Sequence, residues 1–271
     1  VQKIHAASAQ NLINILQAYS HIGAASFRLV SPKVVEHLLM QKTKWNTQDV
    51  ANLASALTRA HQFDVPAFSA IAAAVPLQGE KFLPNEFAPV LNALAHFSKA
   101  KQACVAEAFA AASACMVCRS DLASWSILDL ALSLNAFTKV GMLHLEAVPA
   151  LVEAVSGHLH SLQKKQAMLR PDGLPMSAVT MTLGALSRAN ILPPLTLQRA
   201  LAELLDGGPH QSKMWDEFDA IKLSSQLNAL ARLDTKPHQT DLWRWVLFLI
   251  HRLHASLSDA RAELWNAKTT P

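Results

Sequence analysis

The sequence is poor in glycine, tyrosine and cysteine, and these shortages exclude several classes of protein. Its 271 residues include 8 Gly, 1 Tyr and 3 Cys, and aromatic residues make up only 6%. Strands favour β-branched and aromatic residues and tight turns need Gly, so a β-sandwich or β-barrel is disfavoured. Ala and Leu are abundant instead, and a hydrophobic content of 51% suffices for a large core. The composition therefore predicts an all-α protein.

The cysteines do not fit a disulfide framework or a zinc site. Their number is odd, which argues against a secreted, disulfide-stabilised protein. Cys115 and Cys118 form a CxxC, but no second CxxC or closely spaced His pair follows in the sequence. We interpret these two, together with Cys104, as small apolar core residues of a helix. We expect no metal and no cofactor.

Long apolar runs and catalytic motifs are also missing from the sequence. The most apolar segment, 241–254, is interrupted by Arg244 and Arg252, and a membrane-spanning helix needs about 20 apolar residues. We expect a buried helix there and no membrane insertion. GxxxxGK[ST], HExxH and GxSxG do not occur, and His251 and His254 lack a carboxylate at metal-binding spacing. We therefore expect that the protein is not an enzyme.

The charge and the start of the chain give weaker indications. The net charge of +4 and the pI near 9.0 are compatible with a polyanionic partner, but they do not distinguish an RNA-binding protein from another basic protein. The chain starts with Val1, and residues 1–10 show no signal peptide and no Arg-rich presequence. This start is consistent with an imported organellar protein and equally with a segment of a longer chain.

A short pattern that occurs six times provides the main structural signal. An Ala is followed by Leu, Phe or Tyr, then by a small residue and then by a basic one. The first residues of the six copies are Ala18, Ala56, Ala93, Ala136, Ala185 and Ala229. Their spacing matches two helices and two turns, so we predict one helical-repeat domain, residues 1–271, in which about six helical hairpins stack into an α-solenoid. The expected repeats cover residues 8–45, 46–82, 83–120, 121–174, 175–214 and 215–262.

The first helix of each hairpin should carry the pattern in its last turns, and the apolar stretch after it should form the second helix. Asn46 or Thr47 can cap the helix of the second repeat. Asp49 and Glu86 place carboxylates in first turns, where the helix dipole favours them.

Glycine and proline mark the expected helix ends and loops. Gly23 and Gly141 closely follow the pattern in their repeats and should end their helices in the left-handed conformation. The two longest spacings between copies are taken up by segments 164–175 and 206–217, which contain Pro and Gly and should protrude.

Apolar residues of the pattern define the side of the first helices that should face the core. The residue after each Ala and the residue two positions before it are three positions apart, so they share one helix face. The residues after the Ala, all expected to be buried, are Tyr19, Leu57, Leu94, Phe137, Leu186 and Leu230.

A second face of the same helices combines polar and basic side chains. The residue before the Ala is polar in five copies, whereas Gly184 occupies this position in the fifth copy. The basic residue of the pattern lies four positions later, on the same face. The candidate RNA-binding residues are Gln17, His21, Ser55, Arg59, Asn92, His96, Asn135, Lys139, Arg188, Asn228 and Arg232.

Two explanations of these residues remain open at each single repeat. A cation in the last turn of a helix is stabilised by the helix dipole by about 0.3 to 1 kcal/mol, which can explain it without a ligand. Repetition in register, however, would build a continuous polar and basic strip along the first helices. Modular readers of single-stranded RNA use this geometry, with polar groups on base edges and cations on phosphates.

Three segments carry a resemblance to known repeat families. Residues 47–64, 84–101 and 218–234 share a polar or acidic start, a Leu-rich middle with Asn or Ser, and an end similar to Ala-Leu-Ala-Arg. They resemble the helical repeats of the octotricopeptide and heptatricopeptide families and of FAST-kinase-like proteins. The resemblance extends from about residue 8 to residue 238 and implies an α-solenoid that binds organellar RNA. Segment 241–271 shows no strand-rich RAP domain, the nuclease-like module of many relatives, so the resemblance does not imply RNA cleavage.

Two functions remain in consideration. The first is a structural component of an organellar ribonucleoprotein, such as a mitochondrial ribosome, that binds single-stranded or ribosomal RNA beside neighbouring proteins. The second is a protein-binding scaffold or assembly subunit of an organellar complex without RNA contact, because stacked helical hairpins also bind peptides and subunits. In both cases we expect an organellar location, with mitochondria favoured and a chloroplast or another plastid as the alternative.

Overall fold

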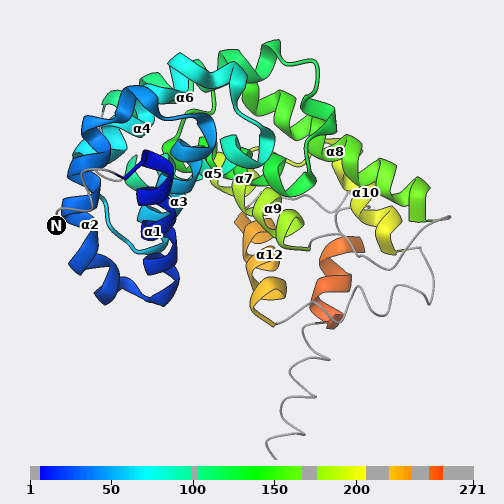
Figure 1. Cartoon of the computed structure of the whole chain (residues 1–271). Coiled ribbons are helices and arrows are strands. Elements are labelled where there is room, and N and C mark those ends of the chain that lie inside the picture. The colour runs from blue at the N-terminus through cyan, green and yellow to red at the C-terminus, as the bar shows by residue number, and fades with distance from the viewer. Residues whose placement is uncertain (1–6, 99–102, 167–175, 206–219, 233–243, 253–271) are drawn as a thin grey trace, which may run out of the picture. The chain divides into compact units, whose positions relative to one another are not determined.

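The structure is a computed structural model, and it describes residues 7–98, 103–166, 176–205, 220–232 and 244–252. Helices are the only regular structure in these residues, so the predicted all-α class is confirmed (Figure 1). The labelled α-helices are α1 Ala9–Ile22, α2 Ala24–Met40, α3 Thr47–Arg59, α4 Val65–Gln78, α5 Pro84–Phe97, α6 Ala103–Cys118, α7 Ile127–Val140, α8 Ala147–Gln166, α9 Met176–Ala189, α10 Leu195–Leu205 and α12 Ala220–Arg232. A further helix covers residues 244–252. Over the described part of the chain, none of the helices is long and apolar enough to cross a membrane.

The chain divides into two compact units, Val1–Ala150 and Leu151–Pro271. In the first unit, α1 packs against α3, α3 against α5, and α5 against α7, so the four helices with the pattern lie side by side (Figure 1). The intervening helices α2, α4 and α6 also pack on one another in chain order. In the second unit, the two helices with the pattern, α9 and α12, are in direct contact. The single repeat domain over 1–271 remains a prediction.

The ends of the first helices follow the local sequence signals. All six copies of the pattern lie in the last turns of a helix, as predicted. Asn46 caps α3: its Oδ1 accepts from the Asp49 N–H at 2.8 Å, and its own N–H donates to Asp49 Oδ2 at 3.2 Å. This reciprocal capping box satisfies two backbone donors that a helix start would otherwise leave without partners.

The two glycines that were expected to end helices behave differently from each other. Gly141 ends α7 with φ 81° and ψ 15°, which is the predicted left-handed conformation. Gly23 has φ 140° and ψ 161°, so the left-handed prediction is wrong at this position. The reason is that Gly23 ends α1 and immediately begins α2: its N–H donates to the Tyr19 carbonyl, and its carbonyl accepts from the Phe27 N–H. The reversal of the chain within a single residue needs a different backbone conformation.

A buried aromatic residue precedes three of the first helices. Each aromatic residue directly follows a short 3-10 helix. The three 3-10 helices are η1 Lys42–Lys44, η2 Gly79–Lys81 and η4 Leu122–Ser124. The aromatic residues are Trp45, Phe82 and Trp125, with exposed fractions of 4%, 1% and 1%. Phe82 stacks on Phe87 in the first turns of α5 with 5.2 Å between ring centroids, which is a hydrophobic staple. The three aromatic residues therefore fix where the chain enters the next helix.

A hydrogen bond closes each of the first three hairpins at this same junction. In each case a side chain at the end of the second helix donates to the carbonyl of the residue that precedes the cap of the first helix. The bonds run from Gln41 to Ala7 at 3.4 Å, from Gln78 to Trp45 at 3.2 Å and from Arg119 to Phe82 at 2.9 Å. Three successive hairpins thus share one closing contact, which supports their description as repeats.

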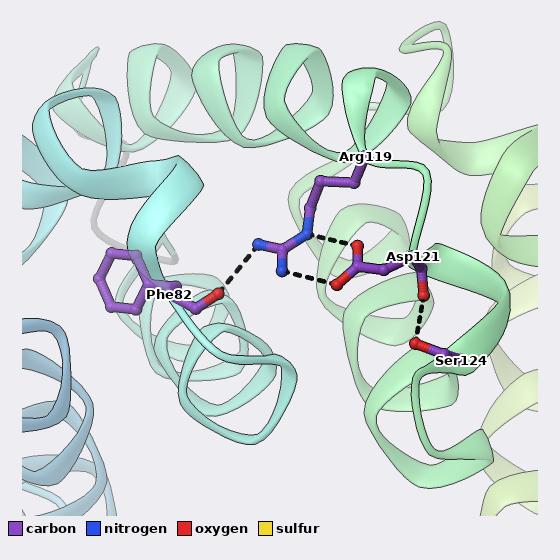
Figure 2. Close-up of polar contacts among 4 residues, drawn as sticks. All are labelled: Phe82, Arg119, Asp121 and Ser124. Atoms are coloured by element: carbon purple, nitrogen blue, oxygen red, sulfur yellow. Dashed lines mark hydrogen bonds and ion pairs between the residues drawn. The ribbon is translucent and has the colours of Figure 1, made fainter.

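The third closing contact is reinforced by an ion pair (Figure 2). Arg119 binds Asp121 through two parallel bonds, Nε to Oδ1 at 2.9 Å and Nη2 to Oδ2 at 3.0 Å. The guanidinium also lies over the Trp125 ring, 5.2 Å from its centroid. The hydrogen bond from Arg119 holds the pKa of the Asp121 carboxyl below its ordinary value.

Two sequence interpretations need correction. None of the three cysteines is a core residue, because Cys104 and Cys115 are half-buried and Cys118 is exposed. The helix at 244–252 is buried on one face only, since Trp245 and Leu249 are fully buried, whereas Leu247 is 61% exposed. Segment 206–217 and most of 164–175 lie outside the described residues.

Candidate nucleic-acid interface

The basic residues of the pattern meet in pairs across neighbouring helices. In the first unit, Arg59 Nη1 lies 2.8 Å from His21 Nε2, which connects the ends of α3 and α1. Lys139 Nζ lies 3.1 Å from His96 Nε2, which connects the ends of α7 and α5. Side chains about 40 positions apart in the sequence are therefore neighbours in space, as stacking in register requires.

The Arg59 guanidinium is held in one orientation by α1. Its Nη1 donates to His21 and also to Ser20 Oγ at 3.2 Å, and the Ser20 hydroxyl donates to the Gln17 carbonyl at 2.7 Å. Because a guanidinium can only donate, His21 Nε2 must accept, and the imidazole in this pair is neutral. Arg59 Nε and Nη2 have no partner in the described part of the chain, and the side chain is exposed.

The second unit contains a pair of two cations. Arg188 on α9 and Arg232 on α12 are both exposed residues on helices that pack together. Partial burial lowers the pKa of the Arg188 guanidinium, and the positive charge of Arg232 adds a smaller lowering. The two like charges are thus close enough for Arg232 to affect the ionisation of Arg188.

The polar position before the Ala is less uniform than the basic one. Gln17, Ser55 and Asn92 are half-buried, and Asn228 is exposed. Asn135 is only 8% exposed, and its carbonyl accepts from the Thr138 hydroxyl at 3.0 Å. Asn135 is thus the one buried polar residue among these positions in the described residues, and it contributes to packing in this structure.

One buried polar residue of the second unit was not identified from the sequence. Gln226 is fully buried, donates to Thr180 Oγ1 at 2.9 Å and accepts from the Trp245 indole at 3.3 Å. It joins α12 to α9 and to the helix at 244–252, so its role is structural. The sequence did not indicate this structural role of Gln226, because its hydrogen-bond partners Thr180 and Trp245 are distant in the sequence.

The expected core face is confirmed in five of the six copies. Leu57, Leu94, Phe137, Leu186 and Leu230 are all at most 2% exposed. Tyr19 in α1 is half-buried, and Ala18 is exposed although the five equivalent Ala residues are buried. The reason is that no first helix precedes α1 among the described residues, so one of its sides stays uncovered.

The described residues contain no group of three or more His, Cys, Asp or Glu side chains that could hold a metal ion. No known protein family and no curated protein matches the chain.

Proposed function

We propose that the protein is a non-catalytic RNA-binding helical-repeat protein, a structural component of an organellar ribonucleoprotein such as a mitochondrial ribosome. In this proposal the hairpins continue as one α-solenoid of about six repeats, related to the octotricopeptide and heptatricopeptide families. The described hairpins and their shared closing contact support the hypothesis that the chain consists of helical repeats. The resemblance in the sequence supports an organellar location.

The observation that carries the proposal is the pairing of basic side chains at the ends of adjacent first helices. Phosphate contacts supply most of the affinity of proteins for nucleic acid, and Arg is suited to bind phosphate through two parallel bonds. The exposed Arg59 guanidinium retains donors for such a ligand, and among the described residues no carboxylate pairs with it. A last-turn cation that only served its own helix dipole would not need to contact the basic position of the preceding first helix.

The polar positions would then approach bases or sugars. Asn228 is exposed and Asn92 is half-buried, and each lies one helical turn before the basic residue of its repeat. Amide groups can donate and accept, so they can read base edges that cations cannot distinguish. Asn135 is buried and Gly184 has no side chain, so these two repeats cannot each read one base. We therefore propose RNA binding with limited sequence preference.

A salt titration of RNA affinity tests this function. The variant Arg59→Gln, Lys139→Gln, Arg188→Gln and Arg232→Gln should bind single-stranded RNA more weakly than the wild type and with a smaller salt dependence. Each lost phosphate contact reduces the log-log slope by about 0.7. The matched control removes the same charge at exposed cations away from the pattern, through Lys33→Gln, Lys42→Gln, Lys44→Gln and Lys81→Gln. Equal losses in the two variants would contradict a site at the pattern helices.

Exposed apolar residues on the second helices are compatible with a protein partner in addition to RNA, or in its place. Leu29 and Met40 on α2 are 86% and 72% exposed, and Leu77 on α4 is 78% exposed. Such residues are common at protein interfaces when they form a patch. If the protein is a scaffold without RNA contact, the wild type should bind RNA weakly, with a slope that the quadruple variant does not change.

A further inference from the structure

We infer that the basic side chains of adjacent repeats act as two-residue phosphate clamps, one formed by His21 and Arg59 and one by His96 and Lys139, with Arg188 and Arg232 as the corresponding pair of the second unit. This inference rests on the proposed RNA-binding function and specifies its ligand chemistry. Each clamp would take one phosphodiester group of a single-stranded RNA. The number of phosphates held would therefore be one for every two repeats.

The first clamp is the best defined, because α1 orients the Arg59 guanidinium. Ser20 and His21 both accept from Nη1, so this nitrogen is directed toward α1. The opposite edge of the guanidinium, formed by Nε and Nη2, has no partner among the described residues. Two parallel N–H groups on this edge match two oxygens of a phosphate. The side chain is thus ordered before the ligand arrives, which reduces the entropy cost of binding.

The imidazole adds a second group to the same ligand site. In the free protein His21 Nε2 accepts from Arg59, so the ring carries no charge in this arrangement. A phosphate between the two side chains could accept from both of them once the ring is protonated or has turned. The two side chains come from different helices, α1 and α3, so the clamp exists only where two repeats pack together.

The same arrangement recurs at the next pair of helices. Lys139 Nζ on α7 lies 3.1 Å from His96 Nε2 on α5, with the imidazole again on the earlier helix and the longer basic side chain on the later one. In the second unit α9 and α12 pack directly, and Arg188 and Arg232 occupy the corresponding positions of the pattern at the ends of these helices. Adjacent helix axes are about 8 to 10 Å apart, so the two clamps of the first unit would be about 16 to 20 Å apart. Phosphates between them would not be held by these cations.

A double-mutant cycle on RNA affinity tests the clamp. The probe is a fluorescently labelled single-stranded RNA of uniform length and mixed sequence, titrated with the full chain at several salt concentrations. The within-clamp cycle uses His21→Ala, Arg59→Gln and their combination. The between-clamp cycle uses Arg59→Gln, Lys139→Gln and their combination, because α3 and α7 are separated by α5. Lys33→Gln on α2 is the single-charge control, and circular dichroism with thermal melting checks that every variant is folded.

If each clamp holds one phosphate, Arg59→Gln should weaken binding by about tenfold. Adding His21→Ala should weaken it by less than about twofold more, with one loss of about 0.7 in the salt slope for both changes together. The between-clamp combination should multiply the two single effects and reduce the slope by about 1.4. Arg59→Lys keeps the charge but loses the two-bond geometry, so it should still lose a substantial part of the affinity.

Three different results would overturn the inference. If RNA binds but the His21 and Arg59 effects multiply, each cation holds its own phosphate, and the clamp is wrong while the proposed function stands. If the wild type does not bind RNA in any of these titrations, the proposed function fails and the clamp fails with it. A double mutant cycle with coupling in both pairs of positions would also contradict the clamp, since it would indicate a general electrostatic effect.

Discussion

The Arg59 guanidinium and the His21 imidazole lie 2.8 Å apart, although 38 positions separate them in the sequence. Both are the last residue of the same four-residue pattern, in consecutive copies. Their contact means that α1 and α3 pack with equivalent residues side by side. A shift of one helix by a single turn would move the two side chains about 5.4 Å apart along the helix axis and would break the contact.

The core face of the pattern can be tested by comparing two leucines. Leu57→Ala should reduce the free energy of unfolding by about 2 to 5 kcal/mol, because the side chain is 1% exposed and its loss leaves a cavity. Leu29→Ala makes the same chemical change at a position that is 86% exposed, and it should change stability by less than about 0.5 kcal/mol. Urea unfolding followed by circular dichroism measures both. Similar losses at the two positions would show that the helical face is wrongly assigned.

Two glycines offer a test of the helix ends. Gly141 ends α7 with φ 81°, so Gly141→Ala forces an L-residue into the left-handed region and should destabilise the protein by about 1 kcal/mol or more. Gly157 lies inside α8, and an added Cβ would meet nothing within 4 Å. Gly157→Ala should therefore stabilise the protein by about 0.5 to 1 kcal/mol. Opposite shifts of the thermal midpoint are expected, and shifts of the same sign would contradict the assigned end of α7.

Local features of the fold could be predicted from the sequence, because they depend on residues that are close in the chain. The cap at Asn46, the end of α7 at Gly141 and the burial of Leu57 all follow from spacing within one helix. The closing contacts could not be predicted in this way, since the partners of Gln78 and Arg119 are more than 30 positions away. The sequence nevertheless contained a usable signal, because an aromatic residue stands eleven positions before the Ala in three repeats.

The candidate site was predictable to a similar extent. The spacing placed the polar and basic residues on one helix face, but it could not tell how deeply each one is covered by the next helix. Asn92 is therefore accessible while the equivalent Asn135 is buried. Nor could the spacing show that Arg59 and Lys139 each contact a His of the preceding first helix, since this depends on how adjacent helices pack.

The cysteines of α6 should differ in reactivity toward an alkylating reagent. Partial burial raises the pKa of the Cys115 thiol despite the nearby Arg119, so little thiolate forms at neutral pH. Cys118 is exposed. Under brief treatment with iodoacetamide at pH 7.5, Cys118 should be modified first and Cys115 several times more slowly, as measured by mass spectrometry of peptides. Denatured protein is the control, in which the two rates should become similar.

The Arg119 contact should matter more than an ordinary surface ion pair. Arg119→Met keeps much of the aliphatic packing but removes the bonds to Phe82 and Asp121, and we expect a loss of about 1.5 to 3 kcal/mol. Arg119→Lys should recover only part of this loss, because an ammonium cannot donate in the same fork geometry. Gln78→Ala removes the equivalent neutral contact to Trp45 and should cost about 0.5 to 1.5 kcal/mol. A loss with Arg119→Lys as large as with Arg119→Met would show that the retained charge contributes nothing, and a wild-type stability of Arg119→Lys would show that charge alone, without geometry, explains the contact.

The ion pair also predicts how stability changes with acid. Arg119 holds the pKa of Asp121 below its ordinary value of 3.8, so the folded state favours the charged carboxylate. A carboxyl group with a lowered pKa in the folded state stabilises the fold fully above its ordinary pKa, and this contribution is lost as the pH falls through the lowered value. Asp121→Asn should therefore be less stable than the wild type at pH 7, and the difference should shrink below about pH 4. Because Asp121 is exposed, solvent screening keeps the effect small, and high salt should reduce it further.

Thermal midpoints of the two proteins between pH 7 and pH 2.5 measure the change. Asp64→Asn is the control, because it removes an exposed helix-capping carboxylate that does not pair with Arg119. A difference between wild type and Asp121→Asn that stays constant down to the lowest pH would show that the carboxylate charge does not contribute through this pair.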